Sequence, residues 1–232
     1  MFNNDLVIID GSFLLHRVFH ATKPYIENSA RKISYIIHRI VSAHPECESY
    51  VVFDKGGCIY RKELSPAYKA NRPPQPDILY KLRDNIMAME ERKGRAVVCR
   101  EGIEGDDLIA SLKKKHGANR RTYIYTIDKD IYQLIDLMCS IVDPFTMMLY
   151  DADQTLIRLG VPPCKVWLKL ALMGDSSDGI KGVTGIGEVN ARRLANQYTD
   201  IDDLLIGEPQ LECHRDVLVL NKQLVLLRDN VI

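Results

Sequence analysis

Short apolar runs alternate with amphipathic segments through the first two thirds of the chain. The apolar runs predict strands at Leu6–Ile9, Tyr50–Phe53, Ala96–Cys99, Tyr123–Ile127 and Ser140–Val142. Apolar residues at helical spacing predict helices at Ala30–Ser42, Ile78–Glu91, Asp106–Lys115 and Lys129–Leu134. Strands that alternate with helices of this length are typical of a mostly parallel sheet flanked by helices on both faces.

From about residue 151 the pattern becomes almost entirely helical. Helices are predicted at Asp153–Leu159, Lys165–Met173, Glu188–Tyr198 and Ile201–Leu205. We therefore expect an α/β protein that forms a single domain over residues 1–232, with a core over residues 1–150 and a helical region over 151–232.

The charge balance changes this picture only in part. The chain has 31 Lys plus Arg and 31 Asp plus Glu, so its formal net charge is zero. This balance excludes a uniformly basic coat but permits segregated charge, which a metal-dependent phosphodiesterase needs.

Several broad classes can be set aside. The sequence contains no run of about 18 apolar residues, so no membrane span is predicted. Met1–Asp5 lacks the basic start of a signal peptide. Six cysteines are scattered without a close pair, which argues against zinc or a disulfide framework and favours the reducing cytoplasm.

One segment, Lys55–Arg95, is basic and irregular at its start. It holds ten Lys or Arg against five Asp or Glu, and tyrosines such as Tyr68 are interleaved. A basic loop with aromatic residues suits a nucleic-acid clamp. The same composition also fits a solvated surface insertion.

Carboxylates fall at the ends of the predicted strands. Asp10, Asp54 and Asp128 each end one strand, so a parallel sheet would bring them to one edge. The same edge should receive four more acids: Glu104, Asp106, Asp107 and Asp130.

Each acid taken alone also fits helix capping. Seven carboxylates on one rim, however, would repel one another unless cations neutralise them. An all-oxygen ligand set favours Mg²⁺, with Mn²⁺ as a substitute, over zinc.

A second acidic pair, Asp175 and Asp178, precedes a glycine-rich turn with Gly182, Gly185 and Gly187. Glycines at this spacing let backbone N–H groups approach a phosphate, beside the N-terminus of a helix that carries Arg192 and Arg193. The turn alone is also an ordinary connector between two helices.

These residues resemble the 5′-nuclease, or flap endonuclease, superfamily, which includes the nuclease domain of bacterial repair polymerases and free-standing bacteriophage enzymes. The matching blocks run in family order: Ile8–Gly11, Val52–Asp54, Tyr68–Arg72, Glu104–Asp107, Thr126–Asp130, Met173–Asp178 and Gly182–Gly187. The end of the chain at Ile232, with no polymerase domain after it, is most similar to a free-standing phage-type member.

The resemblance implies two metal ions. Asp10, Asp54, Glu104 and Asp106 would chiefly hold the first ion. The second would be held chiefly by Asp107, Asp128, Asp130, Asp175 and Asp178. Lys69 and Arg72 match family residues beside the scissile phosphate and are expected to be catalytic.

The resemblance also implies how DNA is bound. Residues 55–95 would form an arch for a 5′ strand, and residues 165–198 a helix–hairpin–helix element that grips duplex and holds K⁺. The expected DNA-binding residues are Arg61, Tyr68, Lys181, Gly182, Gly185, Gly187, Arg192 and Arg193.

The implied activity is that of a 5′-3′ exonuclease and flap endonuclease. It would act on DNA with 5′ ends, flaps or nicks, or on RNA in RNA–DNA hybrids, as a monomer. The chain departs from the family pattern at Gly105 and at Gly179. It also departs at Glu188–Asn190, which lack the lysine that often contacts duplex DNA in the family.

Three other functions fit the sequence less well. A haloacid-dehalogenase-type phosphatase needs a second Asp two residues after Asp10, where this chain has Ser12. A PIN-type ribonuclease would share the sheet but not the glycine hairpin or the basic insertion. A catalytically inactive relative that only binds branched DNA is disfavoured because all nine acids are present.

Overall fold

The computed structural model describes residues 5–22 and 26–232 of the chain. Residues 1–4, on which most of the argument about a signal peptide rests, lie outside the described residues.

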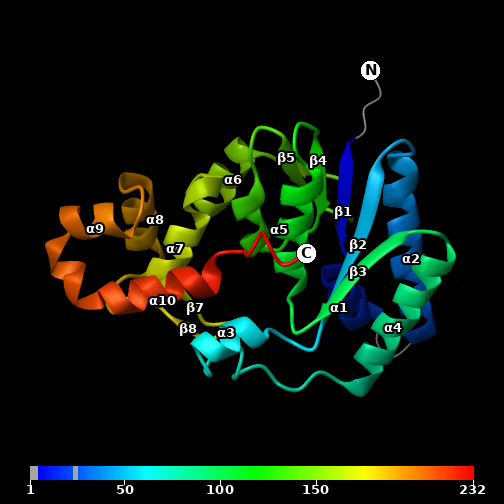
Figure 1. Cartoon of the computed structure of the whole chain (residues 1–232), viewed down its shortest axis with the longest axis horizontal. Coiled ribbons are helices and arrows are strands. Elements are labelled where there is room, and N and C mark those ends of the chain that lie inside the picture. The colour runs from blue at the N-terminus through cyan, green and yellow to red at the C-terminus, as the bar shows by residue number, and fades with distance from the viewer. Residues whose placement is uncertain (1–4, 23–25) are drawn as a thin grey trace.

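A six-stranded sheet with the order β3-β2-β1-β4-β5-β6 forms the centre of the α/β core (Figure 1). Its strands are β1 (Leu6–Asp10), β2 (Glu48–Lys55), β3 (Ala96–Glu101), β4 (Thr122–Tyr125), β5 (Cys139–Val142) and β6 (Leu149–Tyr150). β1 pairs in parallel with β2 and β4, and only β6 runs antiparallel to its neighbour. The predicted mostly parallel sheet is confirmed.

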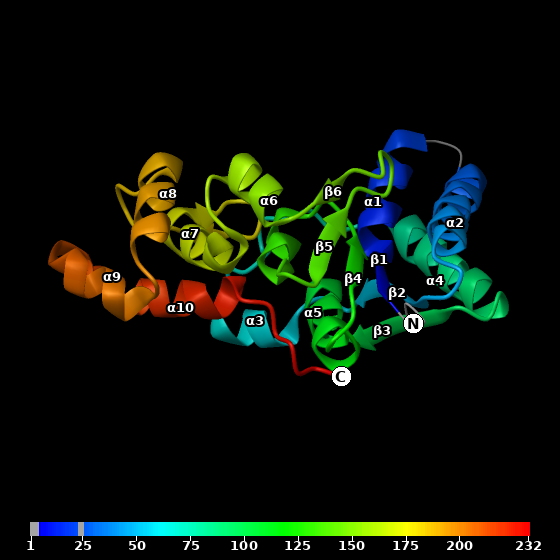
Figure 2. The ribbon, with the colours of Figure 1, turned by 90° about the horizontal axis from the view of Figure 1, so that it is seen from above.

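Helices cover both faces of this sheet, as the alternation along β1 requires. Val7 and Ile9 pack into one core with α1 (Gly11–Thr22), α2 (Ile26–Ala43) and α4 (Asp77–Arg92). Leu6 and Ile8 face the other way, into a core that includes α5 (Gly105–His116). Figure 2 shows α1, α2 and α4 together beside the sheet.

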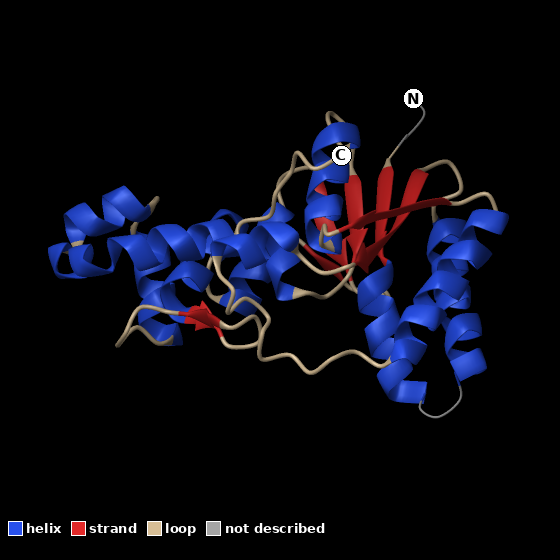
Figure 3. Ribbon diagram, turned by 60° about the horizontal axis from the view of Figure 1, so that its bottom comes forward, coloured by secondary structure: helices blue, strands red, loops and turns tan. Residues whose placement is uncertain are grey.

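Beyond β6 the chain is mainly helical and extends away from the sheet (Figure 3). It contains α6 (Ala152–Leu159), η2 (Pro163–Lys165), α7 (Val166–Met173), α8 (Glu188–Gln197), α9 (Ile201–Gly207), η3 (Pro209–His214) and α10 (Arg215–Val225). Between α7 and α8 lies a small hairpin of β7 (Gly174–Asp175) and β8 (Ile180–Lys181). The predicted helical region with a helix–hairpin–helix element is confirmed.

The basic segment is more regular than its composition suggested. It begins with α3 (Ile59–Leu64) and ends with α4, so only residues 65–76, here called the strap, form a long irregular connection (Figure 1). The Lys69 N–H donates to the carbonyl of Asp178 at 2.7 Å, and the Asn71 amide donates to Ser176 at 2.7 Å. The strap is therefore docked on the turn after β7.

The last residues return to the α/β core. Residues 226–232, here called the return segment, run from α10 along α5 (Figure 1). The Arg228 N–H donates to Asp107 at 3.0 Å, and the Val231 N–H donates to Ser111 at 3.1 Å. Among the described ranges, no helix is long and apolar enough to cross a membrane.

Candidate metal centre

Asp10 is held at the end of β1 by two hydrogen bonds. Its Oδ1 accepts from the Phe13 N–H at 2.8 Å, and its Oδ2 accepts from the Thr126 hydroxyl at 2.9 Å. The neighbouring strand end carries Asp54, whose Oδ1 accepts from the Gly105 N–H at 2.6 Å. These bonds fix both carboxylates at the edge where the sheet meets α1 and α5.

Four acids at this edge, here called the core acids, are Asp10, Asp54, Asp106 and Asp128. Burial, assisted by the charges of Asp54 and Asp128, raises the pKa of Asp10 to about 7, against the lowering effect of the hydrogen bonds from Phe13 and Thr126. Burial, followed by the charges of Asp128, Asp10 and Asp54, raises the pKa of Asp106 well above its usual value. The core acids therefore repel one another in a poorly solvated place.

Three further acids, here called the outer acids, are Asp130, Asp175 and Asp178. Each offers a carboxylate oxygen within 4.8 Å of the others. Burial and the charge of Asp128 raise the pKa of Asp130 to about 7. Burial alone would raise the pKa of Asp175, but hydrogen bonds from Lys129 and Ser177 outweigh it and lower that pKa.

The two groups fit divalent cations. One oxygen of Asp130, Oδ1, is buried and has no hydrogen-bond partner within the described part of the chain. A buried carboxylate oxygen is normally paired, and an all-oxygen donor set suits hard divalent ions. Asp128 also caps η1 (Lys129–Leu134) by accepting from the Asp130 N–H at 3.0 Å, so capping and membership of the cluster coexist.

Glu104 lies beside both groups and meets basic side chains. Its Oε2 accepts from Arg61 at 2.6 Å, and its Oε1 pairs with Lys69. Burial alone would raise the pKa of Glu104, but Lys69 and Arg61 outweigh burial and lower it. The predicted residues Lys69 and Arg72 both lie here, because Arg72 pairs with Asp178.

Asp107 does not line the pocket of the other acids, although it offers an oxygen within 4.8 Å of ligand atoms of Glu104 and Cys58. Its expected role at the second metal stays a prediction. Its side chain is fully buried, and its two oxygens accept from Arg61 at 2.7 and 2.8 Å. Consecutive residues of a helix project about 100° apart. Asp106 therefore faces the other core acids, whereas Asp107 faces Arg61 and Glu104.

Arg61 and Tyr68 were expected to touch DNA, but the structure buries both side chains. Only 2% of Arg61 and 4% of Tyr68 is exposed, so neither side chain offers a surface for phosphate or base contacts. The Tyr68 hydroxyl instead lies 3.1 Å from both Glu104 and Asp178.

The glycine turn divides into a packed part and an open part. A Cβ at Gly182 would lie 2.3 Å from the backbone of Met173, so this glycine is needed for packing. Gly185, with φ of +83°, and Gly187 have open space around them. Lys181 is exposed, whereas Arg192 pairs with Glu188 at 2.6 Å and Arg193 with Glu208 at 3.4 Å.

Some residues of the site were not singled out from the sequence. Thr126 and Ser12 orient the core acids, since Thr126 bonds Asp10 and the Ser12 hydroxyl accepts from the Asp54 N–H at 2.8 Å. Lys129 pairs with Asp175 at 2.7 Å. Thr126 and Lys129 lie inside the matching block Thr126–Asp130, and Ser12 lies two residues after Asp10, which were the signals that the sequence offered.

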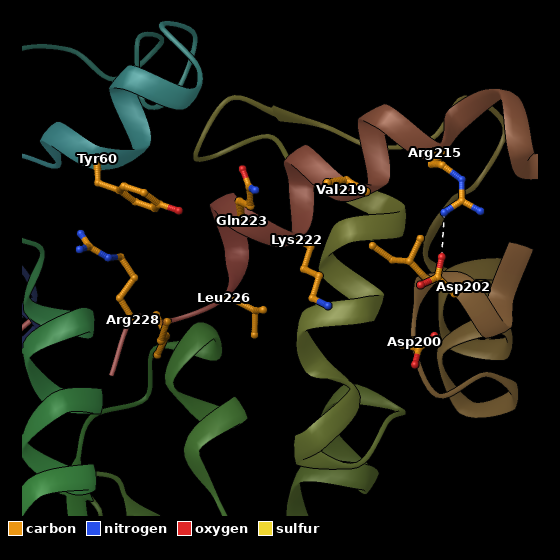
Figure 4. Close-up of a pocket in the computed structure, with 11 residues that line it drawn as sticks. Tyr60, Asp200, Asp202, Arg215, Val219, Lys222, Gln223, Leu226 and Arg228 are labelled. Carbon is orange, nitrogen blue, oxygen red and sulfur yellow. Dashed lines mark hydrogen bonds and ion pairs between the residues drawn. The ribbon is translucent and has the colours of Figure 1, made fainter. Parts of the chain in front are cut away.

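A pocket of about 560 Å³ lies apart from the acids, between α3, α9 and α10 (Figure 4). Tyr60, Lys222 and Arg228 line it, and Arg215 pairs across it with Asp202 at 2.7 Å. None of the nine predicted acids lines this pocket, so the candidate chemistry belongs to the acid cluster.

A parallel sheet with acids gathered at its strand ends, flanked by basic side chains and a helical hairpin, defines the class of metal-dependent nucleases. The chain matches the family model for the 5′-3′ exonuclease N-terminal resolvase-like domain over residues 5–160. It matches the 5′-3′ exonuclease C-terminal SAM fold over residues 161–232. The protein therefore belongs to the 5′-3′ exonuclease family, as the sequence motifs indicated.

Individual relatives agree with this assignment. The chain is 37% identical over 196 residues to DNA polymerase I of Pseudomonas aeruginosa. The matched region covers 82% of this chain but only 22% of the polymerase. It is 31% identical over 242 residues to the flap endonuclease Xni of Vibrio cholerae, covering 97% of this chain and 92% of that enzyme.

Solved structures share the fold. T5 5′-exonuclease with bound zinc ions superposes with a TM-score of 0.87 at 22% identity, covering 97% of this chain and 90% of that one. The expected enzyme class, a hydrolytic 5′ nuclease, is confirmed by these family relationships.

Proposed function

We propose that the protein uses divalent metal ions to hydrolyse phosphodiester bonds near 5′ ends and at 5′ flaps of DNA. The observation that supports this most directly is the convergence of acids from the α/β core and the helical region. Glu104, Asp106, Asp130, Asp175 and Asp178 line one pocket, and the other core acids act on it through their charges.

The ions would be Mg²⁺, with Mn²⁺ able to replace it. Asp10, Asp54, Glu104 and Asp106 would hold one ion and the outer acids the other, with Asp128 between them. When bound, such ions activate a water molecule and stabilise the leaving 3′ oxygen.

Lys69 and Arg72 would place positive charge beside the phosphate that is cut. In the structure Lys69 pairs with Glu104 and Asp178, and Arg72 pairs with Asp178. Lys69 has a φ of 54°, a left-handed conformation that is costly for a residue with a side chain. The docked strap holds both cations at the acids, where they would offset charge that develops on the phosphate.

Duplex DNA would bind at the glycine turn. Lys181, the open backbone at Gly185 and Gly187, and the N-terminus of α8 are accessible for phosphate contacts. We also propose that the glycine turn holds K⁺ and that the enzyme acts on RNA–DNA hybrids as well as on DNA. Residues 1–232 would form one functional domain, and the protein would be a cytoplasmic monomer.

The test is cleavage of labelled oligonucleotides with a 5′ flap, a nick or an RNA–DNA hybrid, with and without Mg²⁺. The wild type should cut the flap only with Mg²⁺, and Asp128→Asn should bind it without cutting. If wild type and variant both bind the flap and neither cuts it, the protein is a DNA-binding relative and the proposed activity is wrong.

A further inference from the structure

Arg61 makes a complete set of buried hydrogen bonds. A guanidinium has five N–H groups, and in Arg61 each has an oxygen acceptor: one oxygen of Glu104, both oxygens of Asp107, and the carbonyls of Leu224 and Leu226. Only 2% of the residue is exposed. Its geometry is therefore fixed on every side.

This arrangement decides which oxygen of Glu104 faces Lys69. Arg61 donates to Oε2 at 2.6 Å and Lys69 pairs with Oε1, while the Tyr68 hydroxyl lies 3.1 Å from Oε1 and 3.2 Å from Oε2. Asp107 supplies the second negative charge that holds the guanidinium in place through paired bonds of 2.7 and 2.8 Å.

The same guanidinium reaches the end of α10, which forms a wall of the acid pocket. Leu224, Val225 and Leu227 line that pocket. Gln133 of η1 binds the same stretch, since its amide donates to the Val225 carbonyl and its oxygen accepts from the Leu227 N–H, both at 3.2 Å. The end of α10 thus connects the element of Glu104 with the element of Asp130.

We propose that Arg61 is a positioning residue that orients Glu104 for metal binding by tying it to Asp107 and to the end of α10. This inference rests on the proposed function, because it takes Glu104 as a metal ligand. Residues that orient metal ligands typically change metal affinity by about 10-fold or more when they are replaced.

The test replaces Arg61 by lysine, which keeps the charge but has a single terminal nitrogen and cannot reach all five oxygens. Binding of Mn²⁺ is measured by the electron paramagnetic resonance signal of the free ion. We expect Arg61→Lys to raise the Mn²⁺ dissociation constant about 10-fold. An unchanged constant in a folded variant would overturn the proposal.

Arg95→Lys is the matched control. Arg95 also pairs with a fully buried carboxylate, that of Glu90 on α4, on the face of the sheet away from α5. We expect this variant to lower the melting temperature and to leave the Mn²⁺ constant unchanged. A similar rise in both variants would show a general loss of stability and would count against a positioning role.

Kinetics with the flap substrate separate the inference from the proposed function. We expect Arg61→Lys to lower kcat and to regain rate at high Mn²⁺, while KM stays within about threefold because phosphate contacts elsewhere hold the DNA. If the wild type does not cut, the proposed function fails, whereas the Mn²⁺ titration still decides on Arg61.

If Arg61→Lys does not fold, the double variant Arg61→Lys/Asp107→Asn replaces the buried carboxylate, whose two bonds to Arg61 a lysine cannot reproduce, by a neutral amide. The lysine still cannot replace the bonds to Glu104 and the two carbonyls, so the Mn²⁺ constant should remain raised. A wild-type constant in this folded double variant would overturn the proposal.

Discussion

Asp106 and Asp107 are neighbours on α5, yet their carboxylates have different surroundings. Asp106 experiences the charges of the core acids, whereas both oxygens of Asp107 are bound by Arg61. The pair offers an internal comparison, because the same substitution can be made at adjacent positions of one helix.

Asp106→Asn should raise the Mg²⁺ concentration needed for half-maximal cleavage by tenfold or more, since it removes a charged ligand. Asp107→Asn should change that concentration much less and should mainly lower the melting temperature, since it leaves Arg61 with less counter-charge. The measurement is a Mg²⁺ titration of flap cleavage beside a thermal melt. Equal shifts in Mg²⁺ requirement would restore Asp107 as a ligand.

Lys69→Ala should reduce turnover by at least about 100-fold, because a preorganised charge beside the reacting group is lost. DNA affinity should fall only modestly, since affinity is spread over many phosphate contacts. Single-turnover rates and binding isotherms measure the two quantities. The control is Lys62→Ala, an exposed lysine in the neighbouring helix α3. Equal losses in rate and affinity would argue against the catalytic role.

At the scale of elements, the strap depends on a glycine in the turn after β7. Gly179 has a φ of +71°, and a Cβ there would lie 2.5 Å from the Ala67 carbonyl of the strap. Gly94 has nearly the same backbone, with φ of +75°, but has nothing within 4 Å of the added atom. Gly94→Ala therefore isolates the cost of the backbone conformation.

Gly94→Ala should lower the free energy of unfolding by about 1 kcal/mol with little change in activity. Gly179→Ala should cost more and should also slow cleavage, because the strap that carries Lys69 must move away from the turn. Denaturant unfolding and flap cleavage of both variants measure this. Equal effects of the two substitutions would mean that the strap is not anchored at Gly179.

The elements that were predicted are those with a regular period. All five predicted strands are present because β-branched apolar runs fill both faces of a covered sheet. α1 escaped prediction, and it begins at a glycine that the packing requires, since a Cβ at Gly11 would lie 2.5 Å from the Phe53 ring. α10 was missed because the run Val217–Leu220 has no single period, and only packing decides its form.

The site was predictable as far as strand ends determine it. Asp10 and Asp54 lie at the carboxyl ends of β1 and β2, and Asp128 follows β4, so parallel pairing brings them to one edge. The roles of Arg61 and Asp107 were not predictable, because they arise from buried pairs far apart in sequence and from the direction in which a helix projects its side chains.

At the scale of the whole molecule, the acid cluster should make stability depend on pH and on divalent metal ions. The pKa values of Asp10 and Asp130 are raised from 3.8 to about 7 in the folded state. Between these values the unfolded chain loses protons that the folded chain keeps, so stability falls as pH rises and levels off above about pH 7. Glu104 and Asp175, whose pKa values are lowered from 4.5 and 3.8, affect stability mainly below about pH 5.

Without divalent ions, the free energy of unfolding should therefore fall from about pH 5 to about pH 8 by a few kcal/mol, and Mg²⁺ should restore most of the loss. Urea unfolding across this range is the measurement. The variant Asp10→Asn/Asp130→Asn should have a flatter profile of unfolding free energy against pH. His16 and His44, whose pKa values are lowered, make stability rise with pH, but they do so in both proteins, so their effect cancels when the two profiles are subtracted. Parallel profiles would contradict the raised pKa values.

The position of β1 in the middle of the sheet has a consequence for folding. Leu6 pairs with Glu48 on one side and with Thr122 on the other. The pairing of β1 is therefore complete only after β4, more than a hundred residues later in the chain, has reached it. Such non-local pairing slows folding. Acquisition of tight Mn²⁺ binding during refolding should therefore lag behind helix formation, and the ion would report when the last long-range pairings have closed.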